Sequence, residues 1–201
     1  MIMDCEKYVG KCVCGREHVL ETKKVIVEYD ALAKFEEYMA EVGLADKKRT
    51  VVYDTNIYKL TEGKHVKADQ EIVLEANGLR SEDILIEDMM TKLDRPQVIV
   101  AYGAGTIMDF GRYPAPKLGI PFVAVPTLAS SDGFTANICS VILEGQKKSI
   151  RMKAPAMVVT DLDIIKGAPA RLVASGIDDI LAKYISIADW KMSKIVAGEN
   201  F

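Results

Sequence analysis

Short apolar runs alternate with helix-like segments along most of the chain. Six runs have strand length, namely Val25–Tyr29, Thr50–Tyr53, Glu71–Leu74, Val98–Tyr102, Pro121–Val125 and Met157–Thr160. Between the first two, the apolar spacing over Ala31–Val42 predicts a helix that Gly43 ends. Ser81 is followed by two acids, which predicts a helix start capped by the serine. Strands alternating with helices indicate an α/β protein with a mostly parallel sheet covered on both faces.

The pattern changes beyond Pro155 and becomes helical from Ala168 onward. One apolar stripe follows the segment Asp178–Val196 and consists of Leu181, Tyr184, Ala188, Met192 and Ile195. We therefore predict a Rossmann-like domain over residues 1–160 and the incomplete start of an all-helical domain over residues 161–201. About one helix is too little to close a core, so we expect its apolar face to be buried by a partner or in a homo-oligomer.

Composition and charge narrow the class of protein. A formal charge of −3 gives no basic field for nucleic acid and no polybasic segment for a membrane surface. The longest apolar runs are strand-sized, and the first residues lack an apolar signal region. Four cysteines in a chain of this size do not make a disulfide framework, so we expect a cytoplasmic protein.

A glycine-containing turn follows the strand Val98–Tyr102 and reads Gly103-Ala104-Gly105-Thr106. Glycines between a buried strand and a helix let a pyrophosphate approach the backbone N–H groups at the helix start. The ordinary dinucleotide fingerprint needs a third glycine at position 108, where Met108 stands, and an acid about twenty residues later. Both are missing, so on these residues alone a plain turn is an equally good interpretation.

The neighbouring motifs give this turn a context. In order they are Gly103-x-Gly105-Thr106-x-x-Asp109, Gly119-Ile-Pro-Phe122, Val125-Pro-Thr127-Leu-Ala-Ser130-Ser-Asp132-Gly133, Thr160-Asp161-Leu162, Ala168-Pro169-Ala-Arg171 and Ser175-Gly-Ile-Asp-Asp179-Ile-Leu-Ala-Lys183. This series resembles the metal-dependent polyol dehydrogenases of the dehydroquinate-synthase-like fold. Cys12-Val-Cys14-Gly15-x-x-His18 before the first strand makes it most similar to the NAD(P)-dependent members that act on glycerol 1-phosphate and dihydroxyacetone phosphate.

The resemblance implies a nucleotide site and a role for each of its residues. Asp54 would bind the adenosine ribose and disfavour a 2′-phosphate, so that NAD is preferred over NADP. The pyrophosphate would be held by Gly103, Gly105 and Thr106, with Asp109 near the loop and the hydroxyls of Thr127 and Ser130 on the nicotinamide side. The residues themselves leave simpler alternatives open, because Asp54 also suits a turn or an N-cap, and the two hydroxyls also suit loop capping.

Two carboxylates carry the implied catalytic chemistry. Asp132 would hydrogen-bond the hydroxyls of a polyol phosphate substrate. Asp179 would be one ligand of a divalent zinc or nickel ion that polarises the alcohol. By spacing alone, Asp179 is better explained as an i,i+4 partner of Lys183 on a solvated helix face. The family site also needs two later histidines, whereas this chain has only His18 and His65, so it resembles the N-terminal portion of a longer enzyme.

Three further points keep alternatives open. The spacing of Cys12, Cys14 and His18 matches no common zinc pattern well, which favours a partly buried loop with incidental thiols. Pro114 and Pro116 should interrupt the helix after the glycine turn. The alternative functions are a non-catalytic nucleotide-binding remnant, a glycerol dehydrogenase and a 3-dehydroquinate synthase relative.

Overall fold

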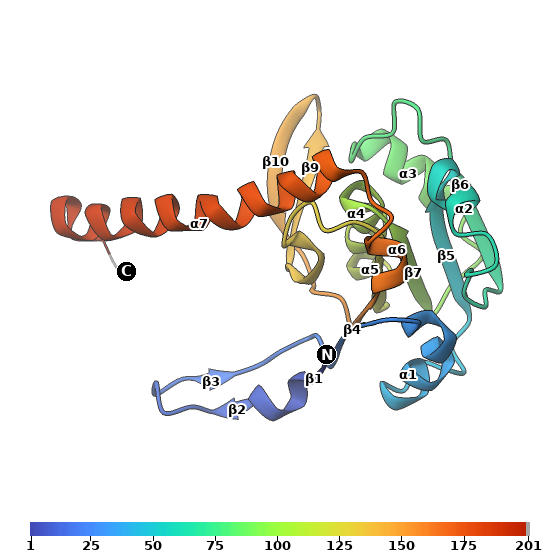
Figure 1. The fold of residues 1–201 in the computed structure, drawn as a ribbon, viewed down its shortest axis with the longest axis horizontal. Helices are drawn as coiled ribbons and strands as arrows, with labels where there is room; N and C mark the ends of the chain where they lie inside the picture. Colours follow the sequence, from blue (N-terminus) through green and yellow to red (C-terminus); the bar gives the residue numbers. More distant parts are fainter. Residues whose placement is uncertain (200–201) are drawn as a thin grey trace.

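A seven-stranded sheet forms the centre of the computed structural model, which describes residues 1–199 (Figure 1). Its strand order is β1-β4-β11-β8-β7-β5-β6. The strands are β1 (Ile2–Asp4), β4 (Lys24–Glu28), β5 (Arg49–Asp54), β6 (Gln70–Leu74), β7 (Val98–Gly103), β8 (Phe122–Pro126) and β11 (Met157–Asp161). All neighbours are parallel except β1, which pairs antiparallel with β4. The six predicted strands and the mostly parallel sheet are confirmed, and β1 was not predicted.

Helices cover both faces of this sheet. They are η2 (Ala31–Lys34), α1 (Phe35–Glu41), α2 (Thr55–Leu60), α3 (Asp83–Thr91), α4 (Gly105–Arg112), α5 (Pro114–Lys117) and α6 (Leu162–Ile165). The last helix, α7 (Ala170–Ala197), lies outside this cover. On one face, Phe35 of α1 packs in a cluster with Val51 and Val100. On the other, Phe110 of α4 packs in a second cluster with Ile99. Because side chains alternate along a strand, each central strand contributes to both clusters.

Several predicted boundaries move for identifiable reasons. The helix expected from Ser81 begins at Asp83, because the Ser81 hydroxyl donates to Asp109 instead of capping. The turn expected after Asp54 is the start of α2. The interruption expected after the glycine turn is confirmed, since α4 ends at Arg112 and Pro114 opens a separate short helix.

Two hairpins lie outside the central sheet and were not predicted. The first joins β2 (Gly10–Lys11) to β3 (Glu17–His18) after the short helix η1 (Cys5–Tyr8). The second joins β9 (Ile138–Leu143) to β10 (Gln146–Arg151) after η3 (Gly133–Thr135). Cys139 and Val141 of β9 belong to the same apolar cluster as α3 and α4, so this hairpin extends the cover of one sheet face.

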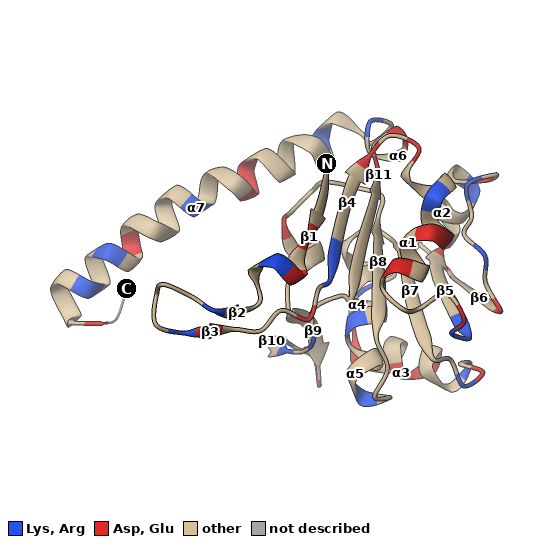
Figure 2. Ribbon diagram, turned by 90° about the horizontal axis from the view of Figure 1, so that it is seen from below, with Lys and Arg blue, Asp and Glu red and all other residues tan. Residues whose placement is uncertain are grey.

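Helix α7 has 28 residues and projects away from the sheet (Figure 1). The predicted helix is confirmed, but its apolar stripe is open to solvent within residues 1–199. Leu181 is 55% exposed, Tyr184 75% and Ile195 84%. Acidic and basic residues alternate along α7 and are interspersed over the rest of the ribbon (Figure 2). Among the described residues, no helix combines the length and the apolarity that a bilayer crossing needs.

Candidate functional site

The sheet topology has a switch point between the carboxyl ends of β5 and β7. From β5 the chain continues outward to β6, whereas from β7 it continues to β8 on the other side. The connections therefore leave these two neighbouring strands in opposite directions, and open α/β sheets bind ligands at such switch points. Asp54 ends β5 and Gly103 ends β7, so the structure brings these two predicted residues to the same edge.

Helix α4 begins directly at this edge without a side-chain cap. Its N-cap is Ala104, which leaves the N–H groups of the first turn without a side-chain acceptor. A Cβ added at Gly103 would lie 2.7 Å from the Ile107 Cβ, so the strand-to-helix turn itself requires that glycine. A Cβ at Gly105 would meet nothing within 4 Å, because this glycine borders a cleft of about 190 Å³. The free N–H groups and the positive helix end suit an anionic group.

A third glycine exists, three residues later than the ordinary fingerprint places it. A Cβ on Gly111 would lie 2.8 Å from the Cβ of Ala101 and 3.3 Å from Cδ2 of Phe122. Gly111 therefore allows α4 to pack closely against β7 and β8, which is the purpose of the third glycine in the ordinary motif. Gly111 was not predicted, because the ordinary fingerprint places the third glycine at position 108.

Asp109 belongs to a buried polar network beneath the cleft. It accepts hydrogen bonds from the hydroxyl of Ser81 at 2.8 Å and from the thiol of Cys139 at 3.4 Å, and it pairs with Arg112 at 3.1 Å. Arg112 also donates to the carbonyl of Gly133 at 2.7 Å. Burial raises the pKa of Asp109 and lowers that of Arg112, and their mutual attraction opposes both shifts. The network thus fixes Gly133, the first residue of η3, to helix α4.

The loop after β8 carries the two predicted hydroxyls in different settings. The backbone N–H of Thr127 donates to the Gly103 carbonyl at 3.0 Å, which joins this loop to the glycine turn. The Thr127 hydroxyl is enclosed and has no hydrogen-bond partner among the described residues. Ser130 lines the cleft, and its carbonyl accepts from the Ser175 hydroxyl of α7 at 3.4 Å. Of the two hydroxyls, only that of Ser130 lies on a residue that borders the cleft.

Asp54 is the N-cap of α2. One carboxylate oxygen, Oδ1, accepts from the N–H groups of Asn56 and Ile57, both at 2.9 Å. The simpler of the two expectations for this residue, an N-cap, is therefore confirmed. Capping uses Oδ1 only and leaves Oδ2 available. The ribose contact of Asp54 stays a prediction.

Asp132 and Asp179 come together at the base of α7. The Asp132 N–H donates to Asp179 Oδ2 at 3.1 Å, and Lys183 Nζ lies 3.3 Å from Asp132 and 3.5 Å from Asp179. The backbone bond from Asp132 and the charge of Lys183 hold the pKa of Asp179 below its usual range. Gly176 permits this approach, because a Cβ there would strike the carbonyl of Ala129. The i,i+4 pair with Lys183, the simpler expectation for Asp179, is confirmed.

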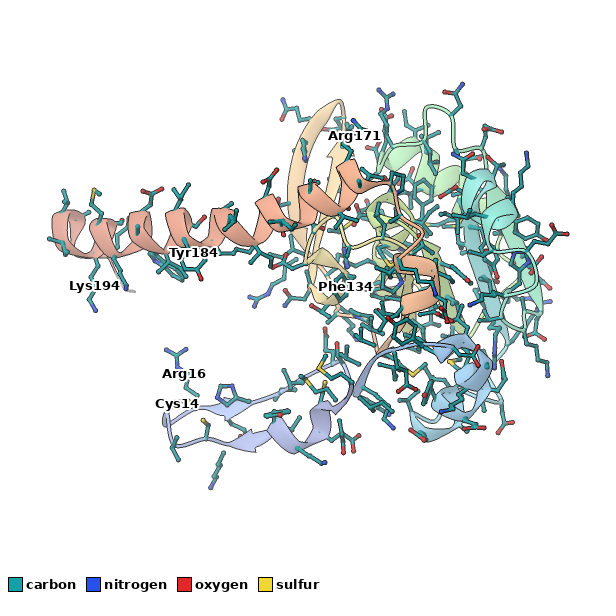
Figure 3. All side chains as sticks on the ribbon, in the orientation of Figure 1. Cys14, Arg16, Phe134, Arg171, Tyr184 and Lys194 are labelled. Atoms are coloured by element: carbon teal, nitrogen blue, oxygen red, sulfur yellow. The ribbon has the colours of Figure 1, made fainter. Side chains whose placement is uncertain are left out.

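An apolar groove continues from the first cleft toward α7. Its volume is about 480 Å³, and Ile177, Ile180 and Leu181 of α7 form one wall. Phe134 borders both cavities and lies where α7 leaves the body (Figure 3). Asp132 lies at the rim of this groove, so a ligand filling both spaces would extend from the glycine turn to the Asp132–Asp179 pair.

The metal ligands that the resemblance implies are not assembled at Asp179 within residues 1–199. The one group of three metal-binding side chains in that part of the chain is Cys12, Cys14 and His18, on the β2–β3 hairpin. Asp179 instead contacts a lysine and a backbone amide. The residues present at the base of α7 therefore do not by themselves fit a catalytic zinc or nickel ion, which takes about three protein ligands.

Comparison with known proteins agrees with this architecture. Residues 26–169 match the family model described as iron-containing alcohol dehydrogenase. The chain belongs to the iron-containing alcohol dehydrogenase family. A glycerol-1-phosphate dehydrogenase [NAD(P)+] of Bacillus licheniformis is 35% identical over 214 residues, covering 100% of this chain and 53% of the relative. One of Halalkalibacterium halodurans is 32% identical, again covering 100% and 53%. The chain thus spans about half the length of these curated relatives.

Solved structures of other proteins share the fold. The glycerol dehydrogenase of Schizosaccharomyces pombe has a TM-score of 0.66 at 23% identity, over 80% of this chain and 42% of that one. A 2-deoxy-scyllo-inosose synthase, solved with carbaglucose-6-phosphate, NAD+ and Co2+, has a TM-score of 0.62 at 18% identity, over 77% and 47%. At these identities the likeness establishes the dehydroquinate-synthase-like fold of this part of the chain.

Proposed function

We propose that this chain forms the nucleotide-binding portion of an NAD-dependent dehydrogenase acting on glycerol 1-phosphate and dihydroxyacetone phosphate. The observation that carries the proposal is the uncapped start of α4 at the β5–β7 switch point, with unobstructed space above Gly105. The family relatives that cover the whole chain bear the name glycerol-1-phosphate dehydrogenase [NAD(P)+], which supports the choice of substrate.

In this proposal the pyrophosphate lies on the backbone of Gly103, Gly105 and Thr106. The free N–H groups and the helix dipole of α4 attract its charge. Asp54 Oδ2, which capping leaves available, accepts from the adenosine ribose, and the carboxylate repels a 2′-phosphate. The nicotinamide extends past Ser130 toward the apolar groove. A bound nicotinamide supplies the hydride acceptor or donor at the substrate carbon.

The substrate end of the site is formed by the loop that carries Asp132. Its carboxylate at the groove rim accepts hydrogen bonds from substrate hydroxyls. Arg112 and Asp109 act as positioning residues. Arg112 donates to the carbonyl of Gly133, the residue after Asp132, and Asp109 holds Arg112 in place. Because Asp179 stands alone as a metal ligand in the described part, we derive no step through a metal ion. The proposed zinc or nickel requires donors that these residues do not provide.

Helix α7 bears on the domain organisation of the protein. We propose that residues 161–201 begin a helical domain, of which residues 200–201 lie outside the described part. The exposed apolar side of α7 then packs against further helices or a second copy, because an apolar surface of this extent favours burial.

Fluorescence titration of the purified chain with NADH tests the nucleotide site. We expect saturable binding, with weaker binding of NADPH because of Asp54. Absence of any NADH binding to folded chain would overturn the nucleotide assignment.

A second candidate is a nucleotide-binding module without catalysis, which the pairing of Asp179 with Lys183 favours. An assay with dihydroxyacetone phosphate and NADH, with added nickel or zinc, separates the two. Metal-dependent NADH oxidation supports the dehydrogenase. NADH binding without turnover supports the module and limits catalysis to a longer polypeptide.

A further inference from the structure

The β2–β3 hairpin gathers three metal-binding side chains far from the nucleotide cleft along the chain. The ligand atoms of Cys12, Cys14 and His18 all lie within 4.8 Å of one another. Cys14 Sγ lies 3.3 Å from His18 Nε2. A tetrahedral zinc ion separates a sulfur from a nitrogen ligand by about 3.6 Å, given its usual bond lengths. The three groups therefore already stand at nearly the spacing that one ion would impose.

The backbone explains why the sequence spacing did not reveal this cluster. Gly10 pairs with His18 across the two strands, which folds the histidine back beside the cysteines. The Cys12 N–H donates to the Arg16 carbonyl at 2.9 Å, and the Gly15 N–H donates to the Cys12 carbonyl at 3.0 Å. Gly15 has φ +80°, a left-handed conformation that glycine adopts without strain. The turn is closed by main-chain bonds, so its shape does not depend on the contact between Cys14 and His18.

The hairpin also lacks the burial that would stabilise it. It extends from the body of the protein, with Cys14 and Arg16 near its tip (Figure 3). Val13 is fully exposed and Val19 is 80% exposed, and only two residues of each strand are paired. A two-stranded hairpin of this kind is marginal in water. Metal binding contributes directly to the folding free energy of such small elements. The expectation of a partly buried loop is wrong, because this segment is an exposed hairpin in which Cys14 is exposed and Cys12 is half-buried.

We propose that Cys12, Cys14 and His18 bind one zinc ion that cross-links the β2–β3 hairpin. Thiolate sulfur and imidazole nitrogen are the ligand set that zinc prefers. Three protein ligands leave one tetrahedral position, which water occupies. Both thiols bind as thiolates, so two protons are released to solvent when the ion binds.

Zinc binding to the full, reduced chain tests the proposal. The chain is dialysed against buffered zinc, bound metal is measured by mass spectrometry, and affinity is obtained by competition with a chromophoric chelator. We expect one zinc per chain. Each of Cys12→Ser, Cys14→Ser and His18→Ala should weaken binding by at least about 100-fold, since even loss of an outer-shell partner typically costs 10–100-fold. Because the hairpin adds little to the core, these variants should keep the melting temperature of the metal-free protein.

Two controls make the outcome specific. Cys5→Ala removes a buried thiol next to the hairpin, and Asp179→Asn removes the carboxylate at the base of α7; both should leave the affinity unchanged. Cobalt should give a thiolate-to-metal charge-transfer band in the parent chain and in neither cysteine variant. Trypsin should cleave after the exposed Lys11 and Arg16 more slowly with zinc than with a chelator.

The proposal is overturned if the hairpin variants bind zinc as well as the parent, if only Asp179→Asn loses it, or if Cys12 and Cys14 form a disulfide that persists in reductant. None of these outcomes depends on NADH binding, so the zinc site and the nucleotide site succeed or fail separately.

Discussion

Two glycines of α4 should respond in opposite ways to an added side chain. Gly105 has no atom within 4 Å of its prospective Cβ, and its φ is not in the left-handed region. Gly105→Val should therefore change the free energy of unfolding by no more than about 0.5 kcal/mol, as is usual for a substitution that meets no neighbour. The valine would, however, occupy the space above the first turn of α4, where we place the pyrophosphate.

The expected loss of affinity follows from the hydrogen bonds that the valine would block. A hydrogen bond to a charged group contributes about 1.5–3 kcal/mol. Losing even one such bond to a phosphate oxygen weakens NADH binding by roughly tenfold to 150-fold. Gly105→Val should thus fold like the parent chain and bind NADH at least about tenfold more weakly.

Gly111→Ala is the matched control on the same helix. Its Cβ would lie 2.8 Å from Ala101 Cβ, on the side of α4 that faces the sheet. Overpacking costs about 1–3 kcal/mol, against which alanine recovers up to about 1 kcal/mol of helix propensity. This variant should lose stability and retain most NADH affinity when measured well below its melting temperature.

The assay combines urea unfolding followed by circular dichroism with NADH fluorescence titration at 15 °C. If Gly105→Val binds NADH within twofold of the parent, the pyrophosphate does not lie on this turn, and the reasoning fails. If Gly105→Val instead unfolds the chain, the space above the residue is not open.

Three further changes test the positions around the turn. Asp54→Asn should preserve the cap of α2, and hence stability, while narrowing the preference for NADH over NADPH; an unchanged ratio of the two dissociation constants would contradict the ribose role. Arg112→Met leaves the buried Asp109 carboxylate unpaired, which should cost about 3–5 kcal/mol at neutral pH in urea unfolding. Burial already raises the pKa of Asp109, and loss of Arg112 should raise it further. The carboxyl is then protonated below that pKa, so the loss of unfolding free energy should be smaller at pH 5 than at pH 8. An equal loss at both pH values would argue against an ionised Asp109. Gly176→Ala should displace α7 from the Ala129 carbonyl, seen as faster proteolysis between residues 127 and 135, whereas Ser175→Ala as its neighbour control loses only one hydrogen bond at 3.4 Å.

The strands were predictable because of where they lie in the sheet. Strands buried on both faces appear as continuous apolar runs, as in Val98–Tyr102. The β2–β3 hairpin was missed because each of its strands has only two residues, and β10 because it is mostly polar and exposed. The apolar run Ile138–Leu143 of β9 has strand length and was overlooked. Helix α2 was missed because Asp54 looks the same at a turn and at an N-cap.

The site was predictable as a set of motifs but not as a set of contacts. Nothing in the sequence pairs Ser81 with Asp109, 28 positions away, because that bond depends on how α3 and α4 pack on the sheet. Gly111 was overlooked because the fingerprint fixes a position, whereas the physical requirement is close packing against Ala101. The convergence of Cys12, Cys14 and His18 could not be predicted for a similar reason, since spacing along the chain does not show that a hairpin brings them together.

The loop that carries Asp132 is held from two sides that belong to different parts of the fold. From the sheet side, Arg112 of α4 donates to the Gly133 carbonyl, and Asp109 holds Arg112 in turn. From the other side, Asp179 of α7 accepts from the Asp132 N–H. The Arg112–Gly133 bond is part-buried and rests on the buried Arg112–Asp109 pair, whereas the Asp132–Asp179 bond is exposed and both of its residues pair with Lys183. Helix α4 therefore holds the loop at Gly133, directly after Asp132, and α7 holds the backbone of Asp132 itself. A displacement of α7 would therefore move Asp179 and, through it, the Asp132 backbone, which would change the geometry of the proposed substrate contact.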